Sequence, residues 1–215
     1  VIALQDEYGK HPNTSISPDA DNTSVVADPA TGDINRAQIS YKSADFGATL
    51  GRQRIIFDNA RFIGNVGWRQ NEQTFDAARI DVTAVENLTA TYAYVSQRND
   101  IFYNDTEVKD HLLNIGYQIP AGKVSTYAYL LEDADSEKTF DTFGLRFSGK
   151  TSLDALDVLY TAEYATQTQN SGATGAKDND AAYSLIEGGV VVSGVTLAAG
   201  METLGGDGTY GFSTP

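Results

Sequence analysis

The chain has 215 residues, no cysteine and a formal net charge of −14, from 29 acidic and 15 basic side chains. The lack of cysteine excludes a disulfide framework, a thiolate metal site and a cysteine nucleophile. The acidic balance leaves no basic stripe for a nucleic-acid backbone. Gly, Thr, Tyr, Asn and Asp are prominent, and no apolar stretch approaches the roughly 20 residues of a transmembrane helix. The composition therefore predicts an all-β protein.

The N-terminal part combines a short strand-like segment with a long polar stretch. Residues 1–8 predict a strand, and residues 9–34 predict a polar loop. Within that loop, Asp19, Asp21 and Asn22 lack the Gly and the distal Glu of an EF-hand. The chain begins inside a strand-like segment and ends without the aromatic C-terminus usual for outer-membrane barrels. We therefore expect residues 1–215 to be one partial domain of a longer protein.

From residue 35 onward, apolar and polar side chains alternate with a period of two, which indicates strands with two different faces. In one segment, Ile80 and Val82 alternate with Arg79 and Asp81. The polar face often carries charges at mid-strand, which suits a water-filled lumen, whereas a soluble sandwich or jelly-roll lectin would bury a bulky, dry core. Ten strands are predicted in this way, at 35–42, 46–54, 75–85, 88–98, 111–119, 123–132, 141–149, 156–168, 181–193 and 195–204.

The connections between these strands alternate between short and long. Tight turns are predicted at 42–45, 86–87, 120–122 and 193–194, with a slightly longer link at 150–155. Long polar stretches are predicted at 55–74, 99–110, 133–140, 169–180 and from 205 onward. Short turns at one end and long loops at the other are typical of outer-membrane barrels, whose short turns are periplasmic. The sequence therefore predicts an antiparallel up-and-down transmembrane β-barrel in the bacterial outer membrane.

Much of the acidity falls in the predicted loops. One group comprises Asp100, Asp105, Glu107 and Asp110, and two further groups lie at 133–137 and 178–180. Carboxylates of this kind could bind Ca²⁺ and bridge to lipopolysaccharide, or they could simply be solvated. We expect no other metal and no cofactor.

Residues 51–79 differ from the rest of the chain because they are rich in arginine. They contain five of the eight arginines and the only tryptophan, Trp68, against three acids. Arginine presents a planar fork of donors suited to carboxylates. We expect residues 52–74 to fold into the pore as a constriction loop and to bias it towards anions. The alternative is that the arginines pair with acids and hold the loop against the wall, and the two roles are compatible. The acids are Asp58, Glu72, Asp76 and Asp81. The expected anchors are Asp58, Trp68, Glu72 and Asp76, with Phe57 and Phe62.

The residues expected to line the pore come from this loop and from the polar strand faces. Other acids on the same faces, Asp157 and Glu163, make the expected lumen mixed in charge rather than uniformly positive. The expected lining residues are Arg36, Arg52, Arg54, Arg61, Arg69, Arg79, Arg146, Asp81 and Glu202.

Two other classes of function are considered. An outer-membrane hydrolase needs a nucleophile with a placed histidine, but the only histidines, His11 and His111, lie in or beside predicted loops with no serine elbow. Asp133 and Asp135 could suggest glycosidase chemistry, but no apolar pocket pattern accompanies them. We expect no enzyme. A non-channel structural, adhesion or receptor barrel remains an alternative.

The arginine-rich run GRQR-x₃-DNxRFxGNVGWRQNEQTFDA resembles the alginate export family and its porin-like relatives. Residues 25–42 and the ending GFSTP add to the resemblance. It implies a monomeric barrel of about 16–18 strands, of which this chain would hold about 10–11. It also implies passive diffusion of small hydrophilic solutes, including anionic ones such as uronates and oligosaccharides, with dedicated export of an anionic polysaccharide as the alternative.

Overall fold

The computed structural model describes residues 2–3, 33–69, 71–154, 156–173, 177–208 and 210–214. Of the segment predicted as a strand at 1–8, only Ile2–Ala3 (β1) is described, and it pairs with Asp33–Ile34 (β2). The rest of that segment, and the polar stretch with His11, Asp19, Asp21 and Asn22, lie outside the described residues. None of the described segments forms a helix long and apolar enough to cross a membrane.

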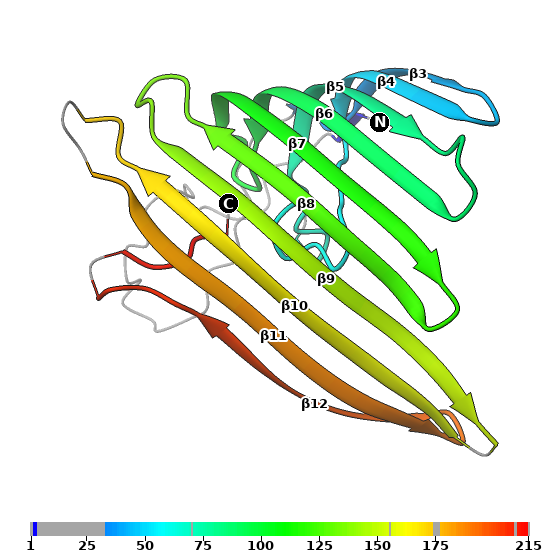
Figure 1. The fold of residues 1–215 in the computed structure, drawn as a ribbon. Helices are drawn as coiled ribbons and strands as arrows, with labels where there is room; N and C mark the ends of the chain where they lie inside the picture. The colour runs from blue at the N-terminus through cyan, green and yellow to red at the C-terminus, as the bar shows by residue number, and fades with distance from the viewer. Residues whose placement is uncertain are drawn as a thin grey trace, which may run out of the picture.

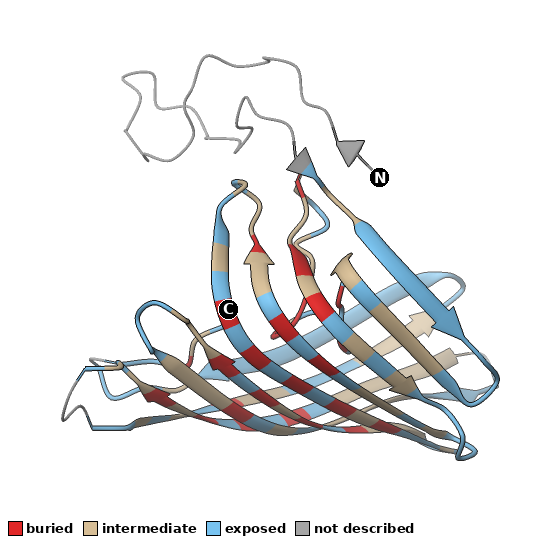
Figure 2. Cartoon of the chain, turned by 90° about the horizontal axis from the view of Figure 1, so that it is seen from above, coloured by how far each residue is buried: buried red, intermediate tan, exposed pale blue. Residues whose placement is uncertain are grey.

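Ten further strands form one antiparallel sheet in which each strand pairs with its neighbours in sequence (Figure 1). This order is an up-and-down meander, and all ten predicted strands are present. The sheet curls into a trough (Figures 1 and 2), so that it has a concave and a convex face. The strands are β3 (Ala37–Lys42), β4 (Phe46–Gln53), β5 (Thr74–Val82), β6 (Leu88–Asn99), β7 (Asp105–Ile119), β8 (Gly122–Glu132), β9 (Thr139–Leu153), β10 (Leu156–Asn170), β11 (Asn179–Val192) and β12 (Val195–Leu204).

Three predicted connections are wrong in length. The turn predicted at 86–87 is 83–87, because β5 ends at Val82 and β6 begins at Leu88. The predicted loop at 99–110 is only 100–104, because β7 begins at Asp105 and pairs with the end of β6. Exposed charges on one face of this extension hid its alternation, while Val108 and Asp110 on the other face are buried. The predicted link at 150–155 is a two-residue turn, because β9 continues to Leu153 and pairs directly with β10.

The convex face of the sheet is apolar and exposed along its middle. One row of paired residues crosses it through Ile80, Tyr92, Leu113, Ala128 and Phe143. Most of these large side chains are exposed, and Figure 2 shows exposed and buried residues alternating along the strands. An apolar, outward face flanked by polar loops is what a strand wall presents to lipid.

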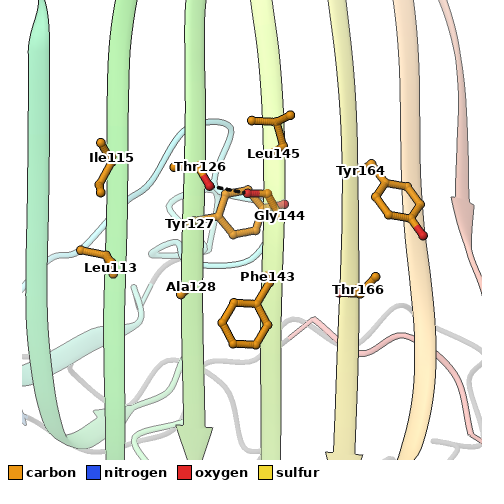
Figure 3. Close-up of a pocket in the computed structure, with 10 residues that line it drawn as sticks. All are labelled: Leu113, Ile115, Thr126, Tyr127, Ala128, Phe143, Gly144, Leu145, Tyr164 and Thr166. Carbon is orange, nitrogen blue, oxygen red and sulfur yellow. Dashed lines mark hydrogen bonds between the residues drawn. The ribbon is translucent and has the colours of Figure 1, made fainter.

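A shallow depression of about 400 Å³ lies in the convex face between β7 and β10 (Figure 3). Its floor is made by small residues such as Ala128 and Gly144, and Phe143 and Leu145 stand at its rim. The hydroxyl of Thr126 donates to the Gly144 carbonyl at 3.1 Å. Gly144 has a packing reason as well, because the Tyr127 ring occupies the space where its Cβ would lie. The depression is therefore the outer side of a well-packed wall.

The concave face carries the polar side chains that alternate with the apolar ones, and a loop covers part of it. Residues 54–73, which we call the arginine loop, leave β4 and return to β5 after packing on this face. In Figure 3, which views the convex face, the loop passes behind the sheet. The buried core contains Ile55, Phe57, Phe62 and Ile63 from this loop, together with Tyr127, Tyr129 and Tyr183 from the wall. The largest buried cluster of the described chain thus lies inside the trough.

Candidate constriction site

Aromatic side chains dock the arginine loop on the wall. Phe57 stacks on Tyr129 with ring centroids 5.8 Å apart and an interplanar angle of 6°. Phe62 lies 5.5 Å from the Tyr127 ring and 5.1 Å edge-on to Tyr183. Such pairs add about 0.5–1.5 kcal/mol each beyond the burial of apolar area. The loop is therefore bound to β8 and β11 by its own side chains.

Asp58 adds a polar anchor between these two phenylalanines. Its carboxylate accepts hydrogen bonds from Lys123 (2.9 Å), Ser125 (2.9 Å) and Asn114 (2.8 Å). Burial raises the pKa of the Asp58 carboxyl, but these hydrogen bonds and the Lys123 charge outweigh burial and leave the pKa below its ordinary value. Asp58 also has a positive φ of 47°, which its contacts hold in place.

The returning half of the loop is a hairpin held by Glu72. Arg54 donates to both Glu72 oxygens at 2.6 and 2.8 Å, and Asn65 donates at 2.7 Å. Burial raises the pKa of Glu72, but the hydrogen bonds from Arg54 and the asparagines lower it by a larger amount. The pKa of Glu72 is therefore below its ordinary value. The amide N–H of Gln73 donates to the Asn65 carbonyl at 2.8 Å. Both ends of the hairpin are therefore fixed.

Cations and acids alternate along the concave wall as local pairs. Arg79 bonds Asp81 at 2.7 Å, and Arg146 bonds Glu163 at 2.5 Å. Tyr127 donates to the second oxygen of Glu163 at 2.8 Å. The same arrangement occurs again on β11 and β12, where Tyr183 donates to Glu202 at 2.7 Å and Arg61 bonds its other oxygen at 2.6 Å. Loop and wall thus share one set of ion pairs.

The structure separates the predicted site residues into groups. Arg61, Glu202, Arg79, Asp81 and Arg146 lie in the pairs just described, on the concave side. Arg52 bonds Asp76 bidentately, at 2.8 and 3.1 Å, where β4 and β5 meet the loop. Arg36 immediately precedes β3, and its neighbour Asn35 donates a hydrogen bond to Glu72 of the loop at 3.0 Å.

Trp68 and Arg69 are the exceptions within the loop. Trp68 is 76% exposed and makes no contribution to the buried cluster. The guanidinium carbon of Arg69 lies 4.0 Å from the centre of the Trp68 ring. The apolar anchoring of the loop therefore comes from Phe57, Phe62 and their isoleucine neighbours, while Asp58, Glu72 and Asp76 each bind a basic side chain.

A second segment folds onto the concave face beside the arginine loop. Residues 205–214 follow β12, and Phe212 packs 5.6 Å from both Phe62 and Tyr183. Gln167 donates to the Ser213 carbonyl at 2.9 Å and accepts from its amide at 2.8 Å. The two in-folded segments therefore touch each other as well as the wall.

Sequence reasoning missed the wall residues that receive the loop. Tyr127 and Tyr129 stand on the concave face with Ser125, where polar residues were expected, and Lys123 binds the loop from the same strand. Bulky aromatics on the otherwise polar face of β8 were an available sign that something packs there. Phe212 gave no comparable sign, because it is isolated in a polar segment.

His111 and Asp133 make local contacts. His111 lies on the convex face, where its ring accepts from or donates to the Tyr92 hydroxyl at 2.8 Å. Asp133 binds the amide and hydroxyl of Ser136 within its own turn. Within the described residues, no three His, Asp or Glu side chains are grouped to hold a metal ion.

Known proteins share this architecture and this sequence pattern. The alginate export family matches residues 2–202. The chain belongs to the alginate export family. OccK1 (OpdK) of Pseudomonas aeruginosa superposes with a TM-score of 0.58 at 11% identity, over 77% of this chain and 46% of that protein. OccAB3 of Acinetobacter baumannii gives 0.55 at 19% identity, over 75% and 44%. No curated protein is significantly similar in sequence.

The structural neighbours show the fold class, so the ten-stranded sheet is part of a porin-like barrel. Membership of the alginate export family places that barrel in the bacterial outer membrane. The chain spans less than half the length of these solved porins. Its family and neighbours are channels, not enzymes.

Proposed function

We propose that residues 1–215 supply part of the wall and the constriction of a channel for passive diffusion of small hydrophilic solutes. The arginine loop carries this proposal, because it lies across the concave face and is bound there by an aromatic cluster and by Asp58 and Arg61. A loop held inside a barrel narrows the water-filled path and sets which solutes pass.

The charges of this constriction support mild rather than strong anion selectivity. Arg52, Arg54 and Arg61 each face a carboxylate at 2.6–2.8 Å, so each pair is close to neutral for a solute a Debye length away, about 8 Å. A dedicated exporter of an anionic polymer, which the family name favours, would need a continuous cationic path. The paired pattern favours small solutes, and the remaining bias would come from cations such as Arg69.

Reconstitution of the full-length protein in a planar bilayer tests this proposal. We expect discrete conductance steps and, in a salt gradient, a reversal potential slightly on the anion side. Shortening the arginine loop to a tight turn should raise the single-channel conductance. An absence of ion-conducting steps would refute the channel and favour a structural, adhesion or receptor barrel.

A further inference from the structure

A groove of about 370 Å³ lies on the convex face, next to the depression of Figure 3. It continues that patch beyond Leu113, Ala128 and Phe143, toward the C-terminal end of β8. Four neighbouring strands, β6 to β9, contribute to its lining, which includes Tyr94, Lys109, His111, Leu130, Glu132 and Asp141. These six side chains stand on the same face as Leu113 and Phe143, because each is an even number of residues from a member of the apolar row or pairs with one that is. The groove is therefore outside the pore, on the side of the wall that meets lipid.

The groove lies at the end of the sheet that carries the longer connections. There, residues 100–104 join β6 to β7, and residues 133–138 join β8 to β9. At the other end, two-residue turns join β7 to β8 and β9 to β10. The longer connections of an outer-membrane barrel are extracellular. The groove therefore faces the outer leaflet of the membrane, which consists of lipopolysaccharide.

Across this groove the convex face changes from apolar to charged. On β7, Leu113 is followed toward the extracellular end by His111 and then by Lys109, over about 14 Å of strand. Such a change is expected where the hydrocarbon of the membrane gives way to headgroups, a level at which aromatic side chains are enriched. The ring centroids of Tyr94 and His111 lie 5.2 Å apart at this level. The groove is thus at the depth of lipid headgroups.

Hydrogen-bond donors gather on the β7 side of the groove. Lys109 is exposed and uses one of its three donors on Glu132, at 2.6 Å. Nδ1 of His111 lies 2.8 Å from the Tyr92 hydroxyl, and Nε2 has no hydrogen-bond partner among the described residues. When Tyr92 donates to Nδ1, Nε2 carries the proton and is itself a donor. An ammonium and an imidazole N–H on one side of a groove can bind a phosphate.

Acceptors gather on the opposite side, which β8 and β9 form. Asp141 is half-buried and forms no hydrogen bond or ion pair within the described part of the chain. Glu132 uses one carboxylate oxygen on Lys109, so its second oxygen is open. Carboxylates accept hydrogen bonds from hydroxyl groups, whereas they repel a phosphate. A ligand that fits this groove therefore carries an anionic group on one side and hydroxyl donors on the other.

We propose that this groove binds the phosphorylated sugar headgroup of lipopolysaccharide from the outer leaflet. A phosphate receives the donors of Lys109 and His111. The sugar hydroxyls donate to Asp141 and Glu132, and the acyl chains extend over the apolar row of the convex face, which includes Leu113. Because the groove lies outside the pore, this lipid site depends on neither the solute nor the conductance of the channel.

Native mass spectrometry of the full-length protein in detergent tests the site, once lipopolysaccharide that copurifies has been removed. The probes are bisphosphorylated lipid A, lipid A without its phosphates, and phosphatidylglycerol, which has a phosphate but no sugar. We expect bisphosphorylated lipid A to bind about tenfold more tightly than either of the others, since each lacks one set of charge-assisted hydrogen bonds.

Variants separate the two sides of the groove. Lys109→Gln should weaken binding of bisphosphorylated lipid A about tenfold, because a charge-assisted hydrogen bond to phosphate is lost. Lys150→Gln is the matched control and should bind like wild type. Lys150 is also an exposed lysine paired with a carboxylate, at 2.7 Å from Asp157, but it lies near the opposite end of β9. Asp141→Ala should weaken binding as well, through loss of the acceptor for sugar hydroxyls.

Three results would overturn the lipid site. Unchanged binding of bisphosphorylated lipid A by Lys109→Gln, or tighter binding by Asp141→Ala, would show that the two sides do not play these roles. Equal binding of phosphatidylglycerol would show that no sugar is recognised. Loss of binding in EDTA would assign the contact to a divalent cation held by the carboxylates. A Lys109→Gln channel that loses lipid A and conducts like wild type would support a lipid site separate from the pore.

Discussion

Phe62 is the residue whose removal should most directly release the arginine loop from the wall. Its ring packs against Tyr127, Tyr129, Tyr183 and Phe212, with centroid distances between 5.1 and 6.5 Å. Only 7% of Phe62 is exposed, so Phe62→Ala leaves a cavity that the rigid strands cannot fill. Truncation of a buried phenylalanine costs about 3–5 kcal/mol. Because these contacts join the loop to the wall, that cost falls on the docked state.

A loss of this size changes the ratio of docked to undocked loop by about 150-fold to 5,000-fold. We expect Phe62→Ala to show larger single-channel conductance and more current fluctuation than wild type. Trypsin should also cleave the detergent-solubilised variant faster after Arg61, which undocking exposes. Phe143→Ala is the control, since Phe143 is a half-exposed phenylalanine of the convex face. Wild-type conductance together with wild-type resistance to trypsin in Phe62→Ala would refute the idea that this cluster holds the loop.

Three further predictions follow from the same contacts. Asp58 has a lowered pKa when the loop is docked. Its contribution to the stability of the docked loop is therefore fully present above the ordinary aspartate pKa of about 3.9, and it is lost as pH falls through the lower docked value. Conductance should therefore stay constant down to about pH 5, and a rise near neutral pH would contradict this. Arg61→Ala should shift the reversal potential towards cations by unmasking its paired acid, while Glu202→Gln should shift it towards anions; equal values would contradict the pairing. Gly144→Ala should destabilise the barrel by about 1–3 kcal/mol in urea unfolding, because an aromatic ring fills the Cβ position. Gly188→Ala, with open space at its Cβ, should not.

The strands were predictable because the wall has a wet face and a lipid face. That asymmetry imposes a strict period of two, as in the alternation of Ile80 and Val82 with Arg79 and Asp81. At the start of β7, Asp105 and Glu107 lie on the exposed face while Val108 and the charged Asp110 lie on the buried face, so charges on both faces hide the period. The error in the start of β7 therefore comes from its polar composition, which resembles that of a loop.

The arginine loop was predictable as a distinct segment, but its contacts were not. Composition identifies its arginines and acids, and arginines do pair with Glu72, Asp76 and Asp81, whereas Asp58 pairs with Lys123. The partners Lys123 and Glu202 lie 65 and 141 residues away from Asp58 and Arg61, and no local pattern specifies contacts at such separations. Trp68 was misplaced among the anchors because hydrophobicity alone does not tell a buried indole from one held at the surface.

The loop arginines pair with acids, and this pairing decides what an arginine-rich segment contributes in a chain with a net charge of −14. Glu163 and Glu202 sit in equivalent settings, each between a tyrosine hydroxyl and an arginine, but Arg146 belongs to the wall and Arg61 to the loop. The same acid-binding arrangement thus stiffens the wall in one place and fastens the loop in the other. An arginine in such a pair holds a segment in place. It adds little net charge to the pore, because its partner largely cancels its charge. Selectivity then depends on cations without such a partner, and a count of arginines in the loop overstates the attraction of the pore for anions.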